Sequence, residues 1–134
     1  MLLINIHHVG IAVRDLDAAI DEYRRQYRVE PISREVVESQ GVEEAMIPIG
    51  GSHIQLLAPL GEDTPVGRFL AARGEGMHHV AYAVADIEAA LEHLRAEGVR
   101  LVDEEPRVGS GGTRIAFVHP RSLAGTLIEL VESP

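Results

Sequence analysis

The amino-acid sequence contains an internal repeat. Residues 7–20 read HHVGIAVRDLDAAI and residues 78–91 read HHVAYAVADIEAAL, with eight of the fourteen positions identical. A second similarity closes each half, where HIQLLAPL at 53–60 corresponds to LIELVESP at 127–134. Self-similarity between two stretches of this length is typical of a duplicated structural unit. We therefore expect two related modules.

The repeat predicts how the 134 residues are divided. We expect a first module at 1–60, a connector with a short helix at 61–76 and a second module at 77–134, with the boundary near Gly74–Met77. A chain of this length fits one compact domain, so the two modules are expected to share it.

Each module shows the same order of predicted elements: a strand, a helix and three further strands. Asp15 and Asp86 follow the first strand of their modules and are suited to cap a helix, and Gly98 lies where the second helix should end. The predicted segments are, in the first half, strand Ile4–Val13, helix Asp17–Tyr27 and strands Pro31–Glu38, Glu43–Ile49 and His53–Leu57, and in the second half, strand Met77–Val84, helix Ile87–Glu97 and strands Val99–Arg107, Thr113–His119 and Thr126–Val131. The predicted fold class is α+β, built from two βαβββ modules.

The period of two in a strand separates the paired histidines. Side chains of a strand alternate between its faces, so His8 shares one face with the small residues Gly10 and Ala12. His7 shares the other face with bulky aliphatic side chains that should pack against the helix. The second strand repeats this pattern around His79. We therefore expect His8 and His79 to face a ligand space, and the other histidine of each pair to be structural.

The last strand of each module places one polar side chain inside an apolar run. Gln55 and Glu129 occupy these places, at corresponding positions of the repeat. A glutamate buried among apolar residues is costly unless it is paired or binds a cation. Two imidazoles and a carboxylate at repeat-related positions therefore point to a divalent cation.

Composition excludes several classes of function. The net charge of −9 disfavours nucleic acid and anionic membrane surfaces as partners, since both require a basic surface. Cysteine is absent, which excludes disulfides and thiolate metal sites. No apolar run reaches the roughly 18 residues that a membrane span needs. The apolar start, Met1–Ile6, lacks the basic residues and the small-residue cleavage site of a signal peptide and is predicted to be a strand. The absence of cysteine fits a cytoplasmic protein, which we expect.

The chain resembles the vicinal oxygen chelate superfamily and, within it, the methylmalonyl-CoA epimerases. The resemblance covers essentially the whole chain and is most specific in VRLVDEEPRVGSGGTRIAFVHPRSLAGTLIEL at 99–130. Supporting stretches are HHVGIAV, EEAMIP, IQLLAPL and GEGMHHVAY. It implies a fold in which the sheets of two βαβββ modules form a cup around one metal ion.

The resemblance also implies roles for individual residues. The metal ligands would be His8, Gln55, His79 and Glu129, and the glutamine is typical of these epimerases. Glu44 matches a glutamate proposed as a catalytic base in the bacterial enzymes, with its neighbour Glu43 as the alternative if the register differs by one. Glu129 would serve as the second acid–base group as well as a ligand.

The implied cofactor is one divalent ion per chain. A set of nitrogen and oxygen ligands without sulfur accepts several metals, and six-coordination favours Co²⁺, Mn²⁺ or Ni²⁺ over Zn²⁺. Of these we expect Co²⁺ first. The implied partner is an acyl-CoA substrate, and the family leads us to expect a homodimer.

Three other activities are compatible with this fold. A glyoxalase I-type lyase acting on a hemithioacetal would share the metal and the chemistry, but the stretch EEPRVGSGGTRIAF disfavours it. A metal-free module that binds small molecules would not keep four ligand positions. An extradiol dioxygenase would use iron on two histidines and a glutamate, normally in a longer chain. Epimerisation of (2R)- and (2S)-methylmalonyl-CoA is therefore the preferred prediction.

Overall fold

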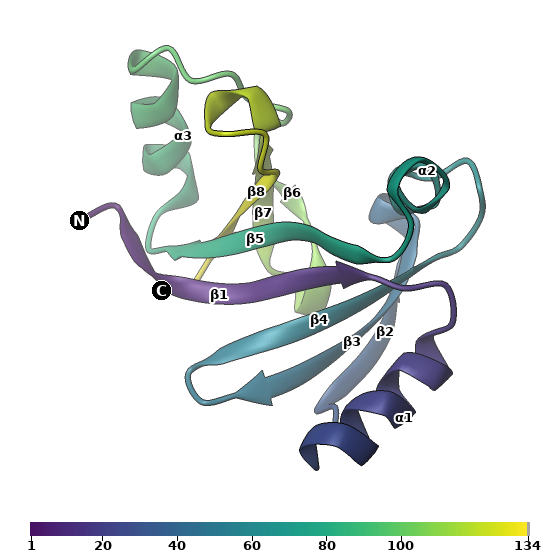
Figure 1. The fold of residues 1–134 in the computed structure, drawn as a ribbon. Coiled ribbons are helices and arrows are strands. Elements are labelled where there is room, and N and C mark those ends of the chain that lie inside the picture. Colours follow the sequence, from purple (N-terminus) through teal and green to yellow (C-terminus); the bar gives the residue numbers. More distant parts are fainter. Residues whose placement is uncertain (134) are drawn as a thin grey trace. The chain divides into compact units, whose positions relative to one another are not determined.

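A computed structural model describes residues 1–133 of the chain (Figure 1). They form two compact units, one of which is His8–His78. The other combines Met1–His7 with the chain from His79 onward. The predicted module limits, 1–60 and 77–134, stay a prediction. None of the helices within residues 1–133 has the length and apolar character needed to cross a lipid bilayer.

The unit His8–His78 contains a four-stranded sheet with two helices. Its elements are β1 (Leu3–Ala12, which enters this unit at His8), α1 (Leu16–Tyr27), β2 (Ser33–Val37), the 3₁₀ turn η1 (Glu38–Gln40), β3 (Val42–Ile49), β4 (Ser52–Pro59) and α2 (Pro65–Arg73). The strand order is β2-β3-β4-β1. Strand β1 runs parallel to β4, and the other pairs are antiparallel.

The other unit follows the same plan with a second set of strands and one helix. Its elements are β5 (Gly76–Val84, which enters this unit at His79), α3 (Ile87–Ala96), β6 (Arg107–Val108), η2 (Ser110–Gly112), β7 (Arg114–Val118), η3 (Pro120–Ser122) and β8 (Ile128–Glu132). The strand order is β5-β8-β7-β6, with β5 parallel to β8 and the remaining pairs antiparallel. The predicted α+β class with two βαβββ modules is confirmed.

One face of each sheet is covered by the helix of its module, as the strand alternation predicts. On α1 the buried side chains Leu16 and Ile20 pack against one face of β3 and β4. The first core cluster consists of Val13, Leu16, Ile20, Ala45, Ile47, Leu56 and Ala58. The second consists of Val84, Ile87, Ala90, Leu91, Ala116, Val118 and Leu130, and Leu3 packs against it. On the opposite face of the sheet in His8–His78, Val66 and Leu70 of α2 pack with Val42 and Leu57, and the rest of that face carries other groups.

The helices begin at the predicted caps. The Asp15 carboxylate accepts a hydrogen bond of 3.0 Å from the Ala18 N–H, and the Asp86 carboxylate accepts one of 3.0 Å from the Ala89 N–H. An aspartate at this position satisfies one of the unpaired N–H groups of the first turn. Gly98 follows the end of α3 with a φ of +76°, which glycine adopts without strain.

The predicted strand Val99–Arg107 is wrong over most of its length. Leu101 makes one isolated bridge to Val118, and a regular ladder is formed only by β6. Between them the Asp103 carboxylate accepts the backbone N–H of Phe117 at 2.8 Å, in the place of a strand carbonyl. Pro106 has no N–H to donate to a ladder. These two features end the pairing that the apolar pattern suggests.

Gly67 in α2 is expected to tolerate no side chain. A Cβ built there would lie 2.4 Å from the Gly61 carbonyl oxygen and 2.6 Å from that of Glu62. Replacing Gly67 with Ala should lower the free energy of unfolding by about 1–3 kcal/mol despite the better helix propensity of alanine. Gly51→Ala is the matched control, because its Cβ would meet nothing within 4 Å. Equal urea midpoints for the two variants would contradict this packing.

Glu132 links the start of α3 to β8 and is expected to make stability depend on pH. The hydrogen bond from Arg114, with a second from the Ile87 N–H, holds the pKa of the Glu132 carboxyl below its ordinary value. The charged form therefore stabilises the fold above the ordinary pKa of 4.5, and this contribution is lost as the pH falls through the lower folded-state pKa.

The measurement compares the wild type with Glu132→Gln. The wild type should have the higher thermal midpoint at pH 7, and the difference should shrink as the pH falls below about 4.5. A difference that stays constant down to pH 3 would show that the Glu132 charge is not the cause.

Candidate active site

Five polar or charged side chains are almost fully buried within residues 1–133. They are His8, Glu44, Gln55, His79 and Glu129, each at most 3% exposed. Burying such groups is costly unless they are hydrogen-bonded, paired with an opposite charge or bound to a metal. These five are the residues that the sequence predicts as metal ligands and acid–base groups.

In the unit His8–His78, three of them share one face of the sheet. Gly10 of β1 lies opposite Gln55 of β4, and His8 is two residues before Gly10. On β3, Met46 lies opposite Gln55, and Glu44 is two residues before Met46. Since paired residues point to the same side of a sheet, His8, Gln55 and Glu44 project from the face not covered by α1.

The predicted base and the predicted amide ligand contact each other. The side-chain amide Nε2 of Gln55 donates a hydrogen bond to Oε2 of Glu44. Glu43, the alternative to Glu44, is half-buried, projects to the opposite face and lies 3.1 Å from the Arg34 guanidinium. The register therefore places Glu44, and not Glu43, beside Gln55. Its role as a base stays a prediction.

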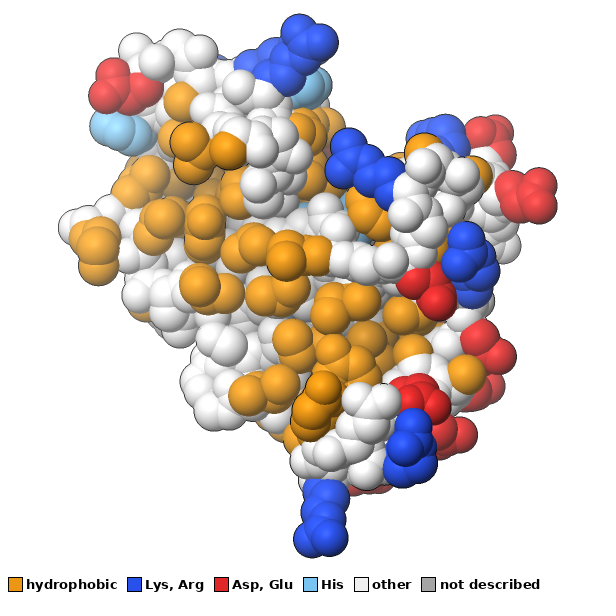
Figure 2. Space-filling model, in the orientation of Figure 1, with side chains coloured by type: hydrophobic (Ala, Val, Ile, Leu, Met, Phe, Trp, Pro, Cys, Tyr) orange, Lys and Arg blue, Asp and Glu red, His pale blue; other side chains and the backbone are white. Residues whose placement is uncertain are grey.

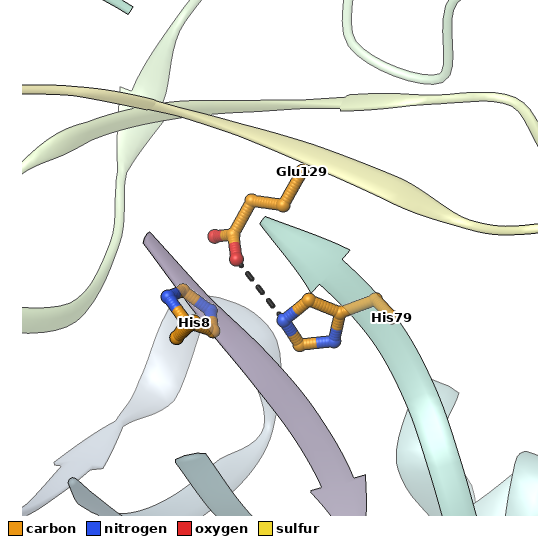
Figure 3. A group of neighbouring side chains, drawn as sticks. All are labelled: His8, His79 and Glu129. Atoms are coloured by element: carbon orange, nitrogen blue, oxygen red, sulfur yellow. Dashed lines mark ion pairs between the residues drawn. The ribbon is translucent and has the colours of Figure 1, made fainter. Parts of the chain in front are cut away.

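In the other unit the structure brings His79 and Glu129 together (Figure 3). Nε2 of His79 lies 3.1 Å from Oε1 of Glu129. Glu129 stands opposite Ala81 on β5 and Phe117 on β7. The Phe117 ring meets the His79 ring edge-on, with centroids 5.8 Å apart and an interplanar angle of 85°. Ala81 is fully buried and packs with Phe117 in one apolar cluster beside Glu129.

The separation within this pair suits a hydrogen bond and would also suit two ligands of one metal ion. Ligand atoms bound at about 2.1 Å and at right angles to each other lie about 3 Å apart, close to the 3.1 Å between His79 and Glu129. The four predicted donors are imidazole nitrogens, an amide and a carboxylate, a set that suits borderline divalent cations. The residues present therefore fit the metal that the fold implies.

Three other histidines, His78, His53 and His93, are less buried than His8 and His79. His78 is half-buried, and its ring packs against Phe69 of α2 with the centroids 4.9 Å apart, in line with its predicted structural role. His53 lies opposite His8 in the β1–β4 register but is only half-buried. His93 is exposed on α3.

Phe117 and Asp103 lie near the candidate site and were not predicted from the sequence as site residues. Phe117 lies directly opposite Glu129, and Arg107 lies with its guanidinium carbon 5.3 Å from the Phe117 ring centroid. The alternation of the predicted strand Thr113–His119 could have placed Phe117 on the face of Glu129. The position of Arg107 depends on where β6 begins, which the apolar pattern does not specify.

Known proteins share both the sequence and the fold of this chain. A sequence profile of the Glyoxalase/Bleomycin resistance protein/Dioxygenase superfamily matches residues 7–117. The ethylmalonyl-CoA/methylmalonyl-CoA epimerase of Cereibacter sphaeroides is 38% identical over 93% of this chain and 95% of its own. The chain belongs to the methylmalonyl-CoA epimerase family of this superfamily.

Solved structures of this family match the fold closely. A methylmalonyl-CoA epimerase in complex with methylmalonyl-CoA and NH4+ superposes with a TM-score of 0.95 at 47% identity, over 99% of this chain and 96% of that one. A variant of the Streptomyces coelicolor enzyme in complex with 2-nitronate-propionyl-CoA gives a TM-score of 0.95 at 47% identity, over 98% of each chain. These likenesses confirm the predicted vicinal oxygen chelate fold.

Proposed function

We propose that this chain interconverts (2R)- and (2S)-methylmalonyl-CoA by removing and returning the proton on C2. The observation that carries the proposal is that the buried polar residues among the described ones are the four predicted ligands and the predicted base. Relatives that are 38% and 47% identical over nearly the whole chain bear the name of this epimerase, and one of them binds methylmalonyl-CoA.

We further propose that one divalent ion is held by His8, Gln55, His79 and Glu129. Co²⁺ is the preferred ion, with Mn²⁺, Ni²⁺ and Zn²⁺ as alternatives. Two neutral imidazoles and a neutral amide leave the charge of a dication unchanged, and Glu129 lowers the site charge to about +1 whenever it is ionised, by simple addition. This charge suits the dianion formed when a malonyl thioester loses its C2 proton, and it gives Gln55 a physical reason to be neutral.

When bound, the ion supplies positive charge close to the thioester oxygen, where the negative charge develops. The chain's own residues handle the proton. In one direction the Glu44 carboxylate takes the proton from C2, and the electron pair of the broken C–H bond moves onto the thioester oxygen. Gln55, which donates to Glu44, orients that carboxylate.

Inversion requires that the proton return to the opposite face of C2. We assign this step to Glu129, which gives its proton to C2 in this direction and removes it in the reverse direction. A positioned acid–base group contributes typically about 10²–10⁴ in rate. The two carboxylates therefore exchange roles with the direction of the reaction, and no net proton is consumed.

The activity is tested with one pure epimer of methylmalonyl-CoA and metal-loaded protein. Chromatographic separation of the epimers should show conversion to an equal mixture. Removal of the metal by a chelator should abolish this conversion, and addition of Co²⁺ should restore it. Conversion of a hemithioacetal without epimerisation would instead support a glyoxalase-type lyase. Binding without any turnover would support a binding module.

We also propose that the chain forms a homodimer. Large apolar side chains are exposed at the start of β1, with Leu2 at 39%, Ile4 at 50% and Ile6 at 49%. Figure 2 shows apolar side chains along β1 on the face in view. Burial of such side chains against a second copy would remove apolar surface from water. Sedimentation at micromolar concentration should give twice the mass of one chain.

The cytoplasmic location stays a prediction.

A further inference from the structure

Arg107 lies on the site face of its sheet. It opens β6 opposite Ile115 of β7, and Ile115 lies opposite Val131 of β8. Val131 is two residues from Glu129, so the side chains of Arg107 and Glu129 leave the same face of the sheet. The helix-covered face of the same strands carries Arg114, which pairs with Glu88 of α3 and with Glu132.

The Arg107 side chain is held in a defined place. Its guanidinium carbon lies 5.3 Å from the centroid of the Phe117 ring, and its Nε lies 3.4 Å from Oδ2 of Asp103. The same Asp103 oxygen accepts the backbone N–H of Phe117. Phe117 in turn meets His79 edge-on. A cation is therefore fixed one aromatic ring away from a predicted metal ligand.

We propose that Arg107 binds the carboxylate of the malonyl group of the substrate. The inference rests on the proposed function and assigns the residue that recognises the acid. A guanidinium has five N–H donors in a planar fork, so it can bind a second carboxylate while it holds Asp103. A fork also fixes the plane of the carboxylate that it binds, which orients the C2–H bond relative to Glu44 and Glu129.

The position of Arg107 favours the acyl carboxylate over the CoA phosphates as its partner. Arg107 and Glu129 lie two strands and two residues apart, which corresponds to roughly 12 Å between their Cα atoms. The arginine side chain covers part of this distance, since it reaches Phe117, the residue opposite Glu129. The phosphates are separated from the thioester by the whole pantetheine arm. An anion bound this close to the Glu129 carboxylate therefore belongs to the acyl group.

The test compares malonyl-CoA with propionyl-CoA, in which a methyl group takes the place of the carboxylate. Binding of each to the metal-loaded protein is measured by calorimetry, with no turnover required. The wild type should prefer malonyl-CoA, and Arg107→Gln should reduce that preference by about 10–100-fold, the loss of a charge-assisted hydrogen-bonded pair. Propionyl-CoA affinity, metal content and thermal midpoint should change little. Arg107→Lys keeps the charge without the fork, so it should lose part of the preference.

Arg114→Gln is the matched control. Arg114 has the same side chain at similar exposure, 44% against 38% for Arg107, and faces the other side of the sheet. The Arg114→Gln variant should leave the ratio of the malonyl-CoA affinity to the propionyl-CoA affinity unchanged. A loss of the same size for both ligands in Arg107→Gln would assign Arg107 to the CoA phosphates and overturn the proposal. An unchanged affinity ratio in both Arg107→Gln and Arg107→Lys would overturn the proposal and leave Arg107 with only a structural role beside Asp103.

Failure of the proposed function gives a different result. In that case the wild type itself would show no preference for malonyl-CoA over propionyl-CoA, and neither would any variant. If the wild type shows the preference and Arg107→Gln keeps it, the function survives and only the assignment of Arg107 is overturned.

Discussion

Glu44→Gln is expected to lower kcat by about 10²–10⁴ and to leave the bound metal in place. Glutamine has nearly the same volume, so the packing against Leu57 and the contact with Gln55 can be kept with little strain. The neutral side-chain amide of glutamine cannot act as a base that accepts a proton. The variant should therefore bind the acyl-CoA as the wild type does and fail in the step that breaks the C2–H bond.

Glu43→Gln is the matched control for this prediction. Glu43 is the adjacent glutamate of the same strand, but it pairs with Arg34 on the other face of the sheet. Loss of a surface ion pair of this kind changes stability by about 0–1 kcal/mol and should leave kcat unchanged. Epimerisation at the wild-type rate in Glu44→Gln, with a full complement of metal, would remove Glu44 from the mechanism.

His79→Ala is expected to have the second large effect, the loss of the metal. His79 is 2% exposed, and its Nε2 lies 3.1 Å from the Glu129 carboxylate. Removing the imidazole takes away one ligand and leaves that carboxylate buried beside an apolar cavity. The variant should contain less than a tenth of the wild-type metal after dialysis, and its epimerisation should fall in proportion. Elemental analysis of the purified protein measures the first quantity.

His78→Ala separates the loss of a ligand from the loss of a buried ring. His78 is the neighbouring histidine, and its ring packs on Phe69 of α2. Its replacement should lower the thermal midpoint through lost packing and leave the metal content near that of the wild type. The opposite pattern, with metal lost in His78→Ala and retained in His79→Ala, would show that His78 and not His79 is the metal ligand.

The repeat and the strand alternation are enough to predict most of the fold and the four candidate ligand positions, whereas the candidate base Glu44 follows only from the family resemblance. Both depend on local regularities: identical residues at corresponding positions, and a period of two that separates His8 from His7. The same alternation placed Gln55 and Glu129 inside their strands, where both are buried. Local patterns are reliable here because β4 and β8, which carry Gln55 and Glu129, are regular strands with a paired neighbour on each edge.

The surroundings of Arg107 could not be predicted in this way. The segment before β6 has the apolar spacing of a strand, but its Asp103 carboxylate accepts the N–H of Phe117, and its Val102 and Asp103 N–H groups both donate to the Phe117 carbonyl. Whether a side chain or a backbone carbonyl accepts the hydrogen bond of a given N–H depends on residues that are far apart in the chain. The contacts of Arg107 follow from that choice, and they become visible only when the register of β6, β7 and β8 is known.

Incubation of the metal-loaded protein with one methylmalonyl-CoA epimer in D₂O tests the central proposal most directly. Removal of the C2 proton and its return from solvent should give deuterium at C2 together with loss of stereochemical purity, and Glu44→Gln should slow the formation of the opposite epimer. Methylmalonyl-CoA that keeps both its C2 proton and its configuration, in protein that carries its full complement of metal, would contradict the assignment of this chain as an epimerase.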